Sequence, residues 1–522
     1  MVWHIFKKDW KLLWRYVMLV WAVQVSFGWM QFVMDSSENR TLERILDAFG
    51  PLPLLASAFL LVAVVHQDVI PGDRQDWLIR PLKSWDLVAA KLLFALLTVN
   101  GPILVGDVLQ GLAHEFSFSA VVGPASSRAI FLLIGFTFPV LVLGVLTKSF
   151  VEAVIGAIVY ALGVSLFQQL VLSRSPNALQ LRWSGVSWVP GLVVLVIAGL
   201  GAGVVLWQQY RQRTTLFSRG LAVGVVALCL LTQFLPWQAA YAVQQWLSPS
   251  RGMPSPIYIR FDPSLGEFHD PSGINPEGSD RRSHLFNDEA TVTIHVPMRI
   301  EGLPEGAVLN ADRSEVRLID NTTKGEGGEL GLGDPLLVRK KDSDNDAPVY
   351  HSLKIRRDVY DRIKNQAVRL EINYSLTLMR LADSETLPAI GGHRHLALAG
   401  SCTTMVDETE TLVEVHCLKS GNLPSCLSAS LEHTLSGRKN PEALFCEPDY
   451  SPFFGFADYG PDALSRRGVT LRFRYTDGSV QYPVSGQQLG DSQVRFRIYS
   501  PQAHFKTNLV IPQITLGDWQ AQ

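Results

Sequence analysis

The sequence "LSPSRGMPSPIYIRFDPSLGEFHDPSG" (247–273) marks the point at which the character of this 522-residue chain changes. Before it, residues 1–247 are dominated by Leu, Val, Ala, Phe and Trp, and their few charges occur in clusters. From its second residue onward, residues 248–522 hold most of the charged residues and most of the prolines. The Pro, Gly and Ser of the stretch itself are typical of a linker or a first irregular strand. One chain therefore combines a part suited to a membrane with a part suited to water.

The first part, 1–247, contains apolar runs that approach the length needed to cross a bilayer, about 20 residues for a hydrocarbon core of roughly 30 Å. We predict seven spans, at 16–34, 51–66, 88–112, 128–147, 150–172, 187–208 and 219–242. The second run is short, and Gln24 and Gln31 interrupt the first. Buried helices of a large soluble protein are the alternative, but seven such runs would need an implausibly large core.

The distribution of Lys and Arg over the short loops predicts the orientation of the spans. Placing the N-terminus in the cytoplasm puts the basic residues between 7 and 15, between 74 and 91, at 148 and between 211 and 219 on the inside. The outside loops then hold fewer: Arg40, Arg44, Arg128, Arg174 and Arg182. Seven crossings would place 248–522 in the periplasm of a Gram-negative cell, with the chain in the inner membrane. We expect the first span to act as an uncleaved anchor.

The N-terminal segment has an amphipathic pattern of its own. Trp3, Phe6, Trp10, Leu13 and Val17 fall on one helical stripe, and the basic residues between 7 and 15 lie largely off it. This pattern is typical of a helix that lies in the membrane interface, with its apolar face in the lipid and its basic groups toward anionic headgroups. The alternative is a basic extension of the first span.

Four further features bear on the spans. Gly199 and Gly203 form a GxxxG pattern that allows helices to approach closely. Pro139 is expected to kink the fourth span. Asp107 and Glu152 are carboxylates near or within spans, where an acid is a candidate functional group, or else lies near enough to an interface to be hydrated.

The second part, 248–522, reads as β structure. Short runs of alternating polar and apolar residues, rich in Val, Ile, Tyr and Thr, predict half-buried strands. Examples are "ATVTIHVPMRI" (290–300), "SEVRLID" (314–320), "AVRLEINYSLTLM" (367–379), "TLVEVHCL" (411–418), "GVTLRFRY" (468–475), "VQYPVS" (480–485) and "SQVRFRIY" (492–499). Many strands with few helical patterns predict an all-β, sandwich-like domain, or two small ones in tandem. The segment "GGHRHLALAG" (391–400) is a candidate internal boundary.

The five cysteines support an extracytoplasmic location for this part. Cys402, Cys417, Cys426 and Cys446 lie close together in 248–522, and in an oxidising compartment such a set predicts two disulfides. Three pairings are open, and we favour Cys402–Cys417 with Cys426–Cys446. A four-cysteine zinc site is the competing interpretation, but it usually has paired CxxC spacing. Cys229 lies in the seventh span and should pack as a small apolar residue.

No motif for catalysis, metal binding or phosphate binding occurs. The chain has no P-loop, no HExxH and no GxSxG elbow. The glycine run "KGEGGELGLGD" (324–334) and the "HRH" at 393–395 are expected to be exposed loops, and the aromatic stretch "YSPFFGFADYG" (450–460) to be a core-filling loop or a binding surface. With a formal net charge of −2, nothing points to nucleic acid.

The first cytoplasmic connection, 66–93, is dense in mixed charge and tryptophan. Pro71 suits the first turn of a short helix and Pro81 ends it, while Ser84 can cap the next helix, with Asp86 near its positive end. We therefore predict a short surface helix at about 72–79 and a third span that begins at Trp85.

With this topology, residues 1–247 resemble the membrane subunits of ABC-2 type transporters. The resemblance rests on the amphipathic segment 3–15 before a span, and more strongly on "DVIPGDRQDWLIRPLKSWDLVAAKLLF" (68–94), which is similar to the family's charged turn, Trp, Arg-Pro and Ala-Lys-Leu pattern. The family's common core has six spans, and a large exterior β region at the C-terminus is unusual in it.

The resemblance implies a permease that binds no cofactor itself and pairs with a separate ABC ATP-binding subunit, which would bind and hydrolyse ATP. It also implies a homodimer or a second permease subunit. Because the family's cytoplasmic connections touch the ATPase, the candidate coupling residues are Asp73, Arg74, Asp76, Trp77, Arg80, Pro81 and Lys83.

Two other functions remain open from the sequence. A membrane-anchored binding or signalling protein would use its spans to transmit what the β domain senses, without transport. A periplasmic hydrolase on a membrane anchor would need a nucleophile and a base, and the sequence shows no such pair.

Overall fold

A computed structural model gives the fold. It describes residues 1–36, 45, 48–67, 84–170, 188–212, 214–247, 257–265, 291–319, 329–332, 337–339, 349–396, 400–406, 413–418, 426–433, 443–446, 469–473, 475–477, 480–482 and 490–519. The chain divides into two compact units, a helical unit up to Ala240 and a β-rich unit from Tyr241 onward. The predicted boundary at 247 coincides with the end of the helix in which this division falls.

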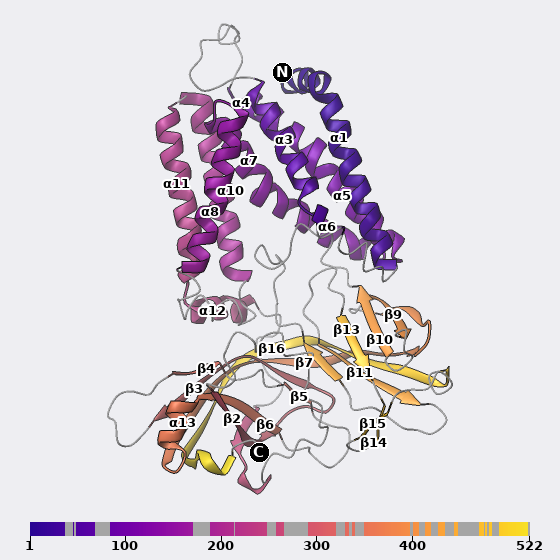
Figure 1. The fold of residues 1–522 in the computed structure, drawn as a ribbon, viewed down its shortest axis with the longest axis vertical. Helices are drawn as coiled ribbons and strands as arrows, with labels where there is room; N and C mark the ends of the chain where they lie inside the picture. Colours follow the sequence, from indigo (N-terminus) through magenta and orange to yellow (C-terminus); the bar gives the residue numbers. More distant parts are fainter. Residues whose placement is uncertain are drawn as a thin grey trace. The chain divides into compact units, whose positions relative to one another are not determined.

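The helical unit is a bundle of helices (Figure 1). Two pairs of consecutive helices in it are joined through short π-helical segments. Its helices are α1 (Val2–Ser36), α3 (Leu52–His66), α4 (Ser84–Ala95), α5 (Gly101–Ala113), α6 (Phe118–Leu132), α7 (Phe138–Leu146), α8 (Phe150–Leu170), α10 (Trp188–Gln212), α11 (Thr215–Leu231) and α12 (Trp237–Leu247). The π segments are η2 (Leu96–Asn100), between α4 and α5, and η3 (Leu133–Thr137), between α6 and α7, and a 3₁₀ turn η5 (Thr232–Phe234) follows α11.

Within the described residues, six helices are long and apolar enough to cross a membrane, not the seven that the sequence predicts. The exception is the predicted span 51–66, which forms the 15-residue helix α3. At 1.5 Å per residue α3 is about 22 Å long, less than the hydrocarbon core of roughly 30 Å. Its apolar residues serve packing instead, since Leu60, Leu61 and Val64 are fully buried.

Helix α3 runs antiparallel to α1. Gln24 of α1 donates a hydrogen bond to Ser57 near the start of α3, at 3.2 Å. Asp9, near the start of α1, is joined through Lys91 to the Val64 carbonyl near the end of α3. The chain therefore returns through α3 to the end of the bundle at which α1 begins.

The last predicted span, 219–242, is also corrected. Helix α11 begins at Thr215 and ends at Leu231, and the 3₁₀ turn and Pro236 separate it from α12. Proline has no backbone N–H with which to continue a helix. The helix therefore ends before Pro236, although the apolar sequence pattern continues past it.

The GxxxG pattern at 199–203 contributes close packing at one of its two positions. A Cβ on Gly199 would lie 3.2 Å from the Ile134 side chain, whereas one on Gly203 would meet nothing within 4 Å. The tightest approach is at Gly201, where a Cβ would lie 2.5 Å from Val225 of α11. The helix α10 thus needs a small residue toward α11 at a position outside the motif.

The β-rich unit contains antiparallel strands in four sheets. The largest has the order β12-β11-β16-β7-β3-β4, with β5 also on β3; the others are β13-β10-β9-β8, β1-β2-β6 and β14-β15. The strands of the first half are β1 (Tyr258–Phe261), β2 (Thr291–Glu301), β3 (Val308–Ile319), β4 (Glu329–Leu332), β5 (Leu337–Arg339), β6 (Val349–Arg356) and β7 (Ala367–Pro388). Those of the second half are β8 (His393–Leu396), β9 (Gly400–Val406), β10 (Val413–Leu418), β11 (Cys426–His433), β12 (Ala443–Cys446), β13 (Val469–Phe473), β14 (Tyr475–Asp477), β15 (Val480–Tyr482) and β16 (Ser492–Thr515). Small helical turns lie at Pro263–Leu265, Arg357–Ile363 (α13) and Leu516–Trp519.

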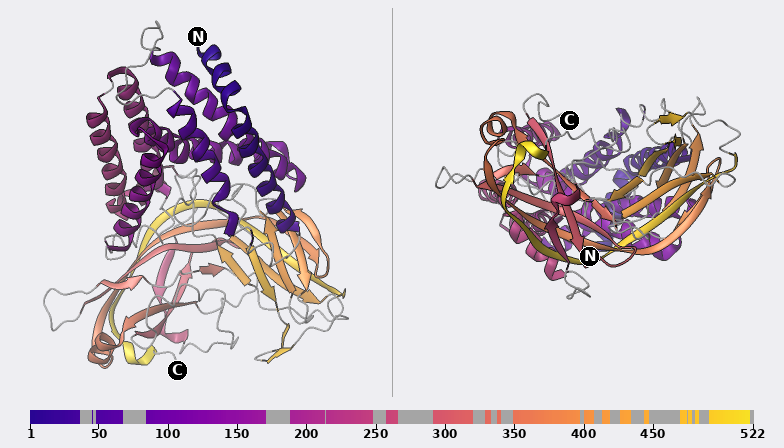
Figure 2. Two further views of the ribbon diagram at one scale, coloured as in Figure 1. Left: turned by 45° about the horizontal axis from the view of Figure 1, so that its top comes forward. Right: turned by 90° about the horizontal axis from the view of Figure 1, so that it is seen from below.

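Two long strands extend through the β-rich unit. Strands β7 and β16 have 22 and 24 residues and pair from Ala367–Thr515 to Pro388–Gln493 (Figure 2). One part of this ladder shares a core with the β1-β2-β6 sheet, and the other part shares a core with the β8–β10 strands. The predicted boundary at 391–400 lies where the chain leaves β7 for the second core, and β16 then returns through both cores.

Two segments that we expected to be loops are partly strands. Glu329–Leu332 of the glycine run is β4, which pairs with β3, and His393–Leu396 is β8, which pairs with β9. Ladder hydrogen bonds to a neighbouring strand thus decide the conformation of runs whose own composition favours a turn. The aromatic stretch 450–460 lies outside the described residues.

One predicted disulfide is confirmed. Cys402 of β9 and Cys417 of β10 are joined, with a Cα–Cα distance of 3.9 Å. The β11–β12 register places Cys426 opposite Cys446, but the Cys446 side chain lies outside the described part, so the second pairing stays a prediction. Cys229 of α11 is a free thiol and is half-buried.

The β-rich unit begins at a buried tyrosine. Tyr241 is fully buried, and its hydroxyl donates to the carbonyls of Leu376 and Phe505, at 3.4 and 3.1 Å. These two residues face each other across the β7–β16 ladder, and the Lys506 ammonium lies 5.2 Å from the tyrosine ring. The start of the β-rich unit is therefore anchored at the middle of its longest ladder.

A histidine is fully buried in the β-rich unit. His351 of β6 is 1% exposed and packs edge-on against the Tyr374 ring at 5.4 Å. Neither of its ring nitrogens has a hydrogen-bond partner among the described residues. Burial lowers the pKa of His351 from 6.5 to about 4, because a charged imidazolium would be desolvated there.

We predict that the β-rich unit loses stability as the pH falls from about 7 to 4. The unfolded chain binds a proton at His351 near pH 6.5, the folded chain only near pH 4, so protonation favours unfolding between these values by up to about 3 kcal/mol. The measurement is the temperature at which protease begins to cut residues 258–519 of the full-length protein, followed across this pH range. His351→Leu should flatten the profile, whereas His393→Leu, at an exposed position, should not; equal profiles for all three proteins would refute the role of His351.

Candidate functional site

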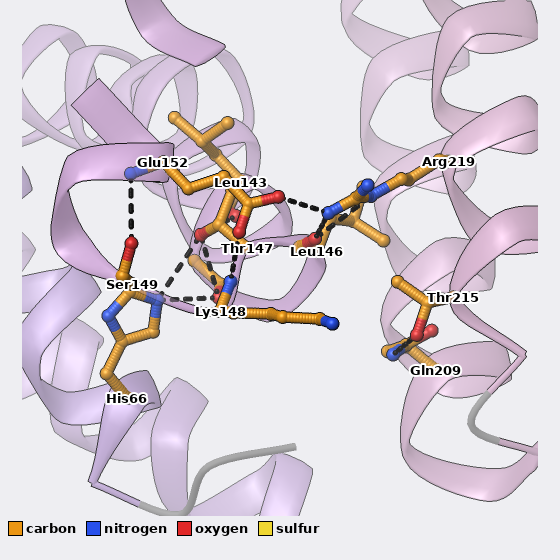
Figure 3. Close-up of polar contacts among 11 residues, drawn as sticks. His66, Leu143, Leu146, Thr147, Lys148, Ser149, Glu152, Gln209, Thr215 and Arg219 are labelled. Atoms are coloured by element: carbon orange, nitrogen blue, oxygen red, sulfur yellow. Dashed lines mark hydrogen bonds and ion pairs between the residues drawn. The ribbon is translucent and has the colours of Figure 1, made fainter. Parts of the chain in front are cut away.

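Polar groups gather at one end of the helical unit, at the N-terminal end of α1. We call this the polar end; it comprises Asp9, His66, Lys91, the turn 147–149 with Glu152, the turn between α10 and α11, and Arg219. The helices that end or begin here are α1, α3, α4, α7, α8, α10 and α11. Figure 3 shows the part of the polar end around the α7–α8 turn.

The start of α8 is capped by its own first residues. The Lys148 backbone N–H donates to the Glu152 carboxylate at 2.7 Å, and the Glu152 N–H donates to the Ser149 hydroxyl at 3.2 Å (Figure 3). Ser149 thus caps an N–H group that the first helical turn leaves without a partner, as in a Ser-x-x-Glu box, while the Glu152 carboxylate binds the N–H of Lys148, the residue before the cap. Glu152, which the sequence marked as a candidate intramembrane acid, therefore has a structural role at a helix end.

Arg219 of α11 connects the two helices of this turn. Its guanidinium donates from Nε and Nη2 to the Leu146 carbonyl at the end of α7, at 3.2 and 2.8 Å, and its Nη2 lies 2.5 Å from Glu152. A cation suits the C-terminal end of a helix, where carbonyl groups have no partners within the helix. The Arg219 and Glu152 side chains are 44% and 38% exposed, so the ion pair itself contributes little stability.

The end of α3 is joined to the end of α7 by a histidine. Nε2 of His66 lies 3.1 Å from the Gly144 carbonyl and 3.3 Å from the Thr147 hydroxyl. A Cβ at Gly144 would lie 3.4 Å from Val65, an ordinary contact distance, so the two helices pack against each other here. A similar contact joins α10 and α11, where the Gln209 amide donates to the Thr215 hydroxyl at 3.3 Å across the turn between them.

The most deeply buried part of the polar end is an ion pair between α1 and α4. The Lys91 ammonium donates to Asp9 at 2.8 Å and to the Val64 carbonyl of α3 at 2.8 Å. The side chains of Lys91 and Asp9 are 3% and 0% exposed. A buried ammonium is costly unless it is paired and hydrogen-bonded, so these contacts let α1, α3 and α4 meet around a charge.

The predicted coupling residues at 73–83 lie outside the described residues. The helices on either side of them are described: α3 ends at His66 and α4 begins at Ser84. His66 lies in the polar end, and Lys91 lies two turns into α4. The connection that carries these residues therefore leaves from and returns to the polar end.

The predicted interfacial stripe packs partly against other helices. Phe6 and Leu13 are buried, at 7% and 5% exposure, and the Phe6 ring lies 6.0 Å from Phe94 of α4. Trp10 is partly buried, whereas Trp3 is 56% exposed and stacks on Phe6. The stripe continues without interruption into the first span, because α1 runs from Val2 to Ser36.

The other predicted acid, Asp107, forms an ion pair within the bundle. It is 3% exposed, and the Arg128 guanidinium lies 2.5 Å from its carboxylate. Arg128 had been assigned to an outside loop by the seven-span topology, but it lies inside α6. The sequence offered a signal for this pairing, since isolated charges of opposite sign within neighbouring apolar segments are expected to meet.

Sequence reasoning missed Asp9 and the Ser149–Glu152 box. The box has a local signature, Ser-x-x-Glu before an apolar run, and could have been found. Asp9 has none, because its partner Lys91 is 82 positions away.

No group of three or more His, Cys, Asp or Glu side chains among the described residues could hold a metal ion. Comparison with protein-family models gives no match for this chain, and comparison with curated proteins gives none either. The functional argument therefore rests on the residues of the site, the number of long apolar helices and the sequence resemblance described above.

We predict that breaking the buried Asp9–Lys91 pair is more damaging than removing it. Lys91→Met alone leaves a buried carboxylate and should lower the free energy of unfolding by about 3–5 kcal/mol, whereas Asp9→Leu with Lys91→Met should cost much less. Arg219→Ala, at the exposed pair, should cost about 1 kcal/mol or less. Thermal unfolding of the detergent-solubilised protein measures these three variants and Asp9→Leu alone, which completes the double-mutant cycle. Additive effects of the two single substitutions at 9 and 91 would contradict the pairing.

Proposed function

We propose that this protein is the membrane-spanning permease subunit of an ABC-type transporter of the ABC-2 type. In this proposal a separate ATP-binding subunit hydrolyses ATP, and the chain itself is neither an enzyme nor a cofactor carrier. The resemblance of 3–15 and 68–94 to that family supports it, as does the number of long apolar helices, since the family's core has six spans. The polar end would face the cytoplasm and the ATPase.

The observation that carries the proposal is the chain of contacts that spreads from the flanks of 68–83. At one flank, His66 binds the end of α7, and Arg219 connects that end to α8 and α11. At the other flank, Lys91 of α4 binds Asp9 of α1 and Val64 of α3. A force applied by a partner to 68–83 would therefore reach helices α1, α3, α4, α7, α8 and α11 through hydrogen bonds and ion pairs.

The charge of the polar end suits a partner with acidic groups. Lys148 is exposed at the α7–α8 turn, and in Figure 3 its side chain points away from that turn toward the side of α10 and α11. Lys7, Lys11 and Arg15 are exposed on the first turns of α1. Basic groups on this end also agree with a cytoplasmic side, because cytoplasmic loops carry an excess of Lys and Arg.

We propose that the β-rich unit lies outside the cytoplasm, in the periplasm of a cell with two membranes, and handles substrate or a periplasmic partner. Two observations support this. The Cys402–Cys417 disulfide is of a kind that forms in oxidising compartments. Helix α3 runs antiparallel to α1 and returns the chain to the polar end before α4 begins, so in this proposal α3 acts as a seventh pass beside the six long helices, although it is shorter than a full crossing.

Copurification tests the pairing with an ATPase. An ATP-binding subunit should be recovered with the tagged chain from membranes in mild detergent. Arg74→Glu with Arg80→Glu should reduce its recovery by about tenfold or more, because reversed charges meet like charges at such an interface. Arg40→Glu with Arg44→Glu, on the predicted opposite side, is the matched control. Recovery that is absent throughout would favour a binding or signalling protein without transport, whereas equal recovery with all variants would refute the docking role of Arg74 and Arg80.

A reporter fused after Gln522 tests the orientation. A periplasmic reporter such as alkaline phosphatase should be active there, and a cytoplasmic reporter should not. The reverse result would place the β-rich unit in the cytoplasm, where the Cys402–Cys417 disulfide would be exposed to reduction.

A further inference from the structure

Two spans of the bundle are interrupted in the same way. The span α4–α5 contains η2, and Pro102 is the second residue after it; the span α6–α7 contains η3, and Pro139 is the second residue after it. A proline removes the hydrogen bond to the carbonyl four positions earlier and its ring clashes with that carbonyl. A π turn widens the backbone at this place, and such turns are frequent at functional sites. Pro139, expected to kink its span, is thus accommodated by η3.

The carbonyl that Pro102 leaves without its helical hydrogen bond accepts a hydrogen bond from a different helix. Four positions before Pro102 is Thr98, whose carbonyl accepts a hydrogen bond from the Trp21 indole of α1 at 2.9 Å. The Thr98 hydroxyl donates to Phe94 at 2.7 Å. The interruption is therefore a built feature of the bundle, with its backbone satisfied by a neighbouring helix.

The last residues of the two π segments bind each other. The Thr137 hydroxyl donates to the Asn100 side-chain oxygen at 3.0 Å, and the Asn100 amide donates to the Ala129 carbonyl of α6 at 3.3 Å. Thr137 and Asn100 are 0% and 4% exposed. The Asp107–Arg128 ion pair joins the same two spans further along α5 and α6.

A change in either segment would disturb this contact. Converting a π turn into an α-helical turn shifts the register of the following residues by one position, which corresponds to about 100° of rotation and 1.5 Å of rise. Asn100 or Thr137 would turn away, and the other polar group would remain buried without that partner unless its own segment moved as well. Packing and hydrogen bonding therefore favour both segments changing together.

We propose that the Asn100–Thr137 hydrogen bond couples the two Pro-interrupted spans, so that a change of helical register at η2 is transmitted to η3 and the reverse. Asn100 and Thr137 are positioning residues in this proposal, and the two spans act as one moving element. In a permease this would carry motion from the polar end of α4 across the membrane. The coupling is a property of the bundle and does not depend on an ATPase partner.

Hydrogen–deuterium exchange of the full-length protein in nanodiscs tests the coupling. Pro102→Ala restores the missing N–H and should slow exchange of the amides at 96–101 by about threefold or more, because an α-helical turn holds them better. It should also slow exchange at 133–138, the segment on the other span. Pro139→Ala is the mirror experiment, read at 96–101.

The role of the hydrogen bond is isolated by isosteric variants. In a Thr137→Val background, Pro102→Ala should slow exchange only in its own segment, whereas Thr137→Ser, which keeps the hydroxyl, should retain the effect on both. Pro124→Ala is the matched control, since Pro124 lies inside α6 without a π turn at its position.

Three results would overturn the proposal. The first is slowing that stays within the substituted segment in both directions. The second is transmission that persists with Thr137→Val. The third is a Pro→Ala change that leaves exchange unaltered even in its own segment. A variant that does not elute as a folded protein is replaced by its mirror, which tests the same contact from the other span.

Discussion

A lysine ammonium inside an apolar bundle has to be neutralised, and in this protein Asp9 does so. The pair requires the third turn of α1 to lie against α4, and the second hydrogen bond of Lys91 brings the end of α3 to the same point. The polar end is thereby built around a charge rather than around a surface loop. The inner face of α1 therefore already packs against α3 and α4 at its amphipathic start, and the same helix continues from there into the span.

The same demand for satisfied polar groups explains the other features of the bundle. The Leu146 carbonyl at the end of α7 is bound by Arg219, and the start of α8 is closed by the Ser149–Glu152 box. Deeper in the bundle, the carbonyl displaced by Pro102 is bound by Trp21. The end of α7 and the break at Pro102 are matched by a donor from a different helix, and the start of α8 is matched by its own first turn. Helix ends and breaks, which weaken an isolated helix, thus become the places where the helices of this bundle are joined.

In the β-rich unit, the unifying element is the long ladder of β7 and β16. It supplies one side of both hydrophobic cores, so that neither core is complete without it. Because β16 follows the second core in sequence and returns to the first, the two cores cannot fold as independent tandem domains. Tyr241, the first residue of this unit, binds the ladder through two carbonyls that face each other across it.

Much of the fold was predictable where the signal is local. The apolar runs that became helices, the alternating runs that became β2, β7, β10 and β16, and the Cys402–Cys417 pairing all follow from patterns within short windows of sequence. The predicted span 51–66 was wrong as a full crossing because composition does not distinguish a short buried helix from a spanning one. The strand at 329–332 was missed because its conformation depends on pairing with β3.

By itself, the sequence determined the division into an apolar and a polar part, the type of most elements and the local capping chemistry, since these depend on neighbours within a few residues. Only the tertiary structure decided which charges and polar groups meet: Asp9 with Lys91, Asp107 with Arg128, and Asn100 with Thr137. The physical reason is that burial makes an unpaired polar group costly, but it does not specify which distant residue will be the partner. That choice is made when the helices pack and the available donors and acceptors are brought within reach.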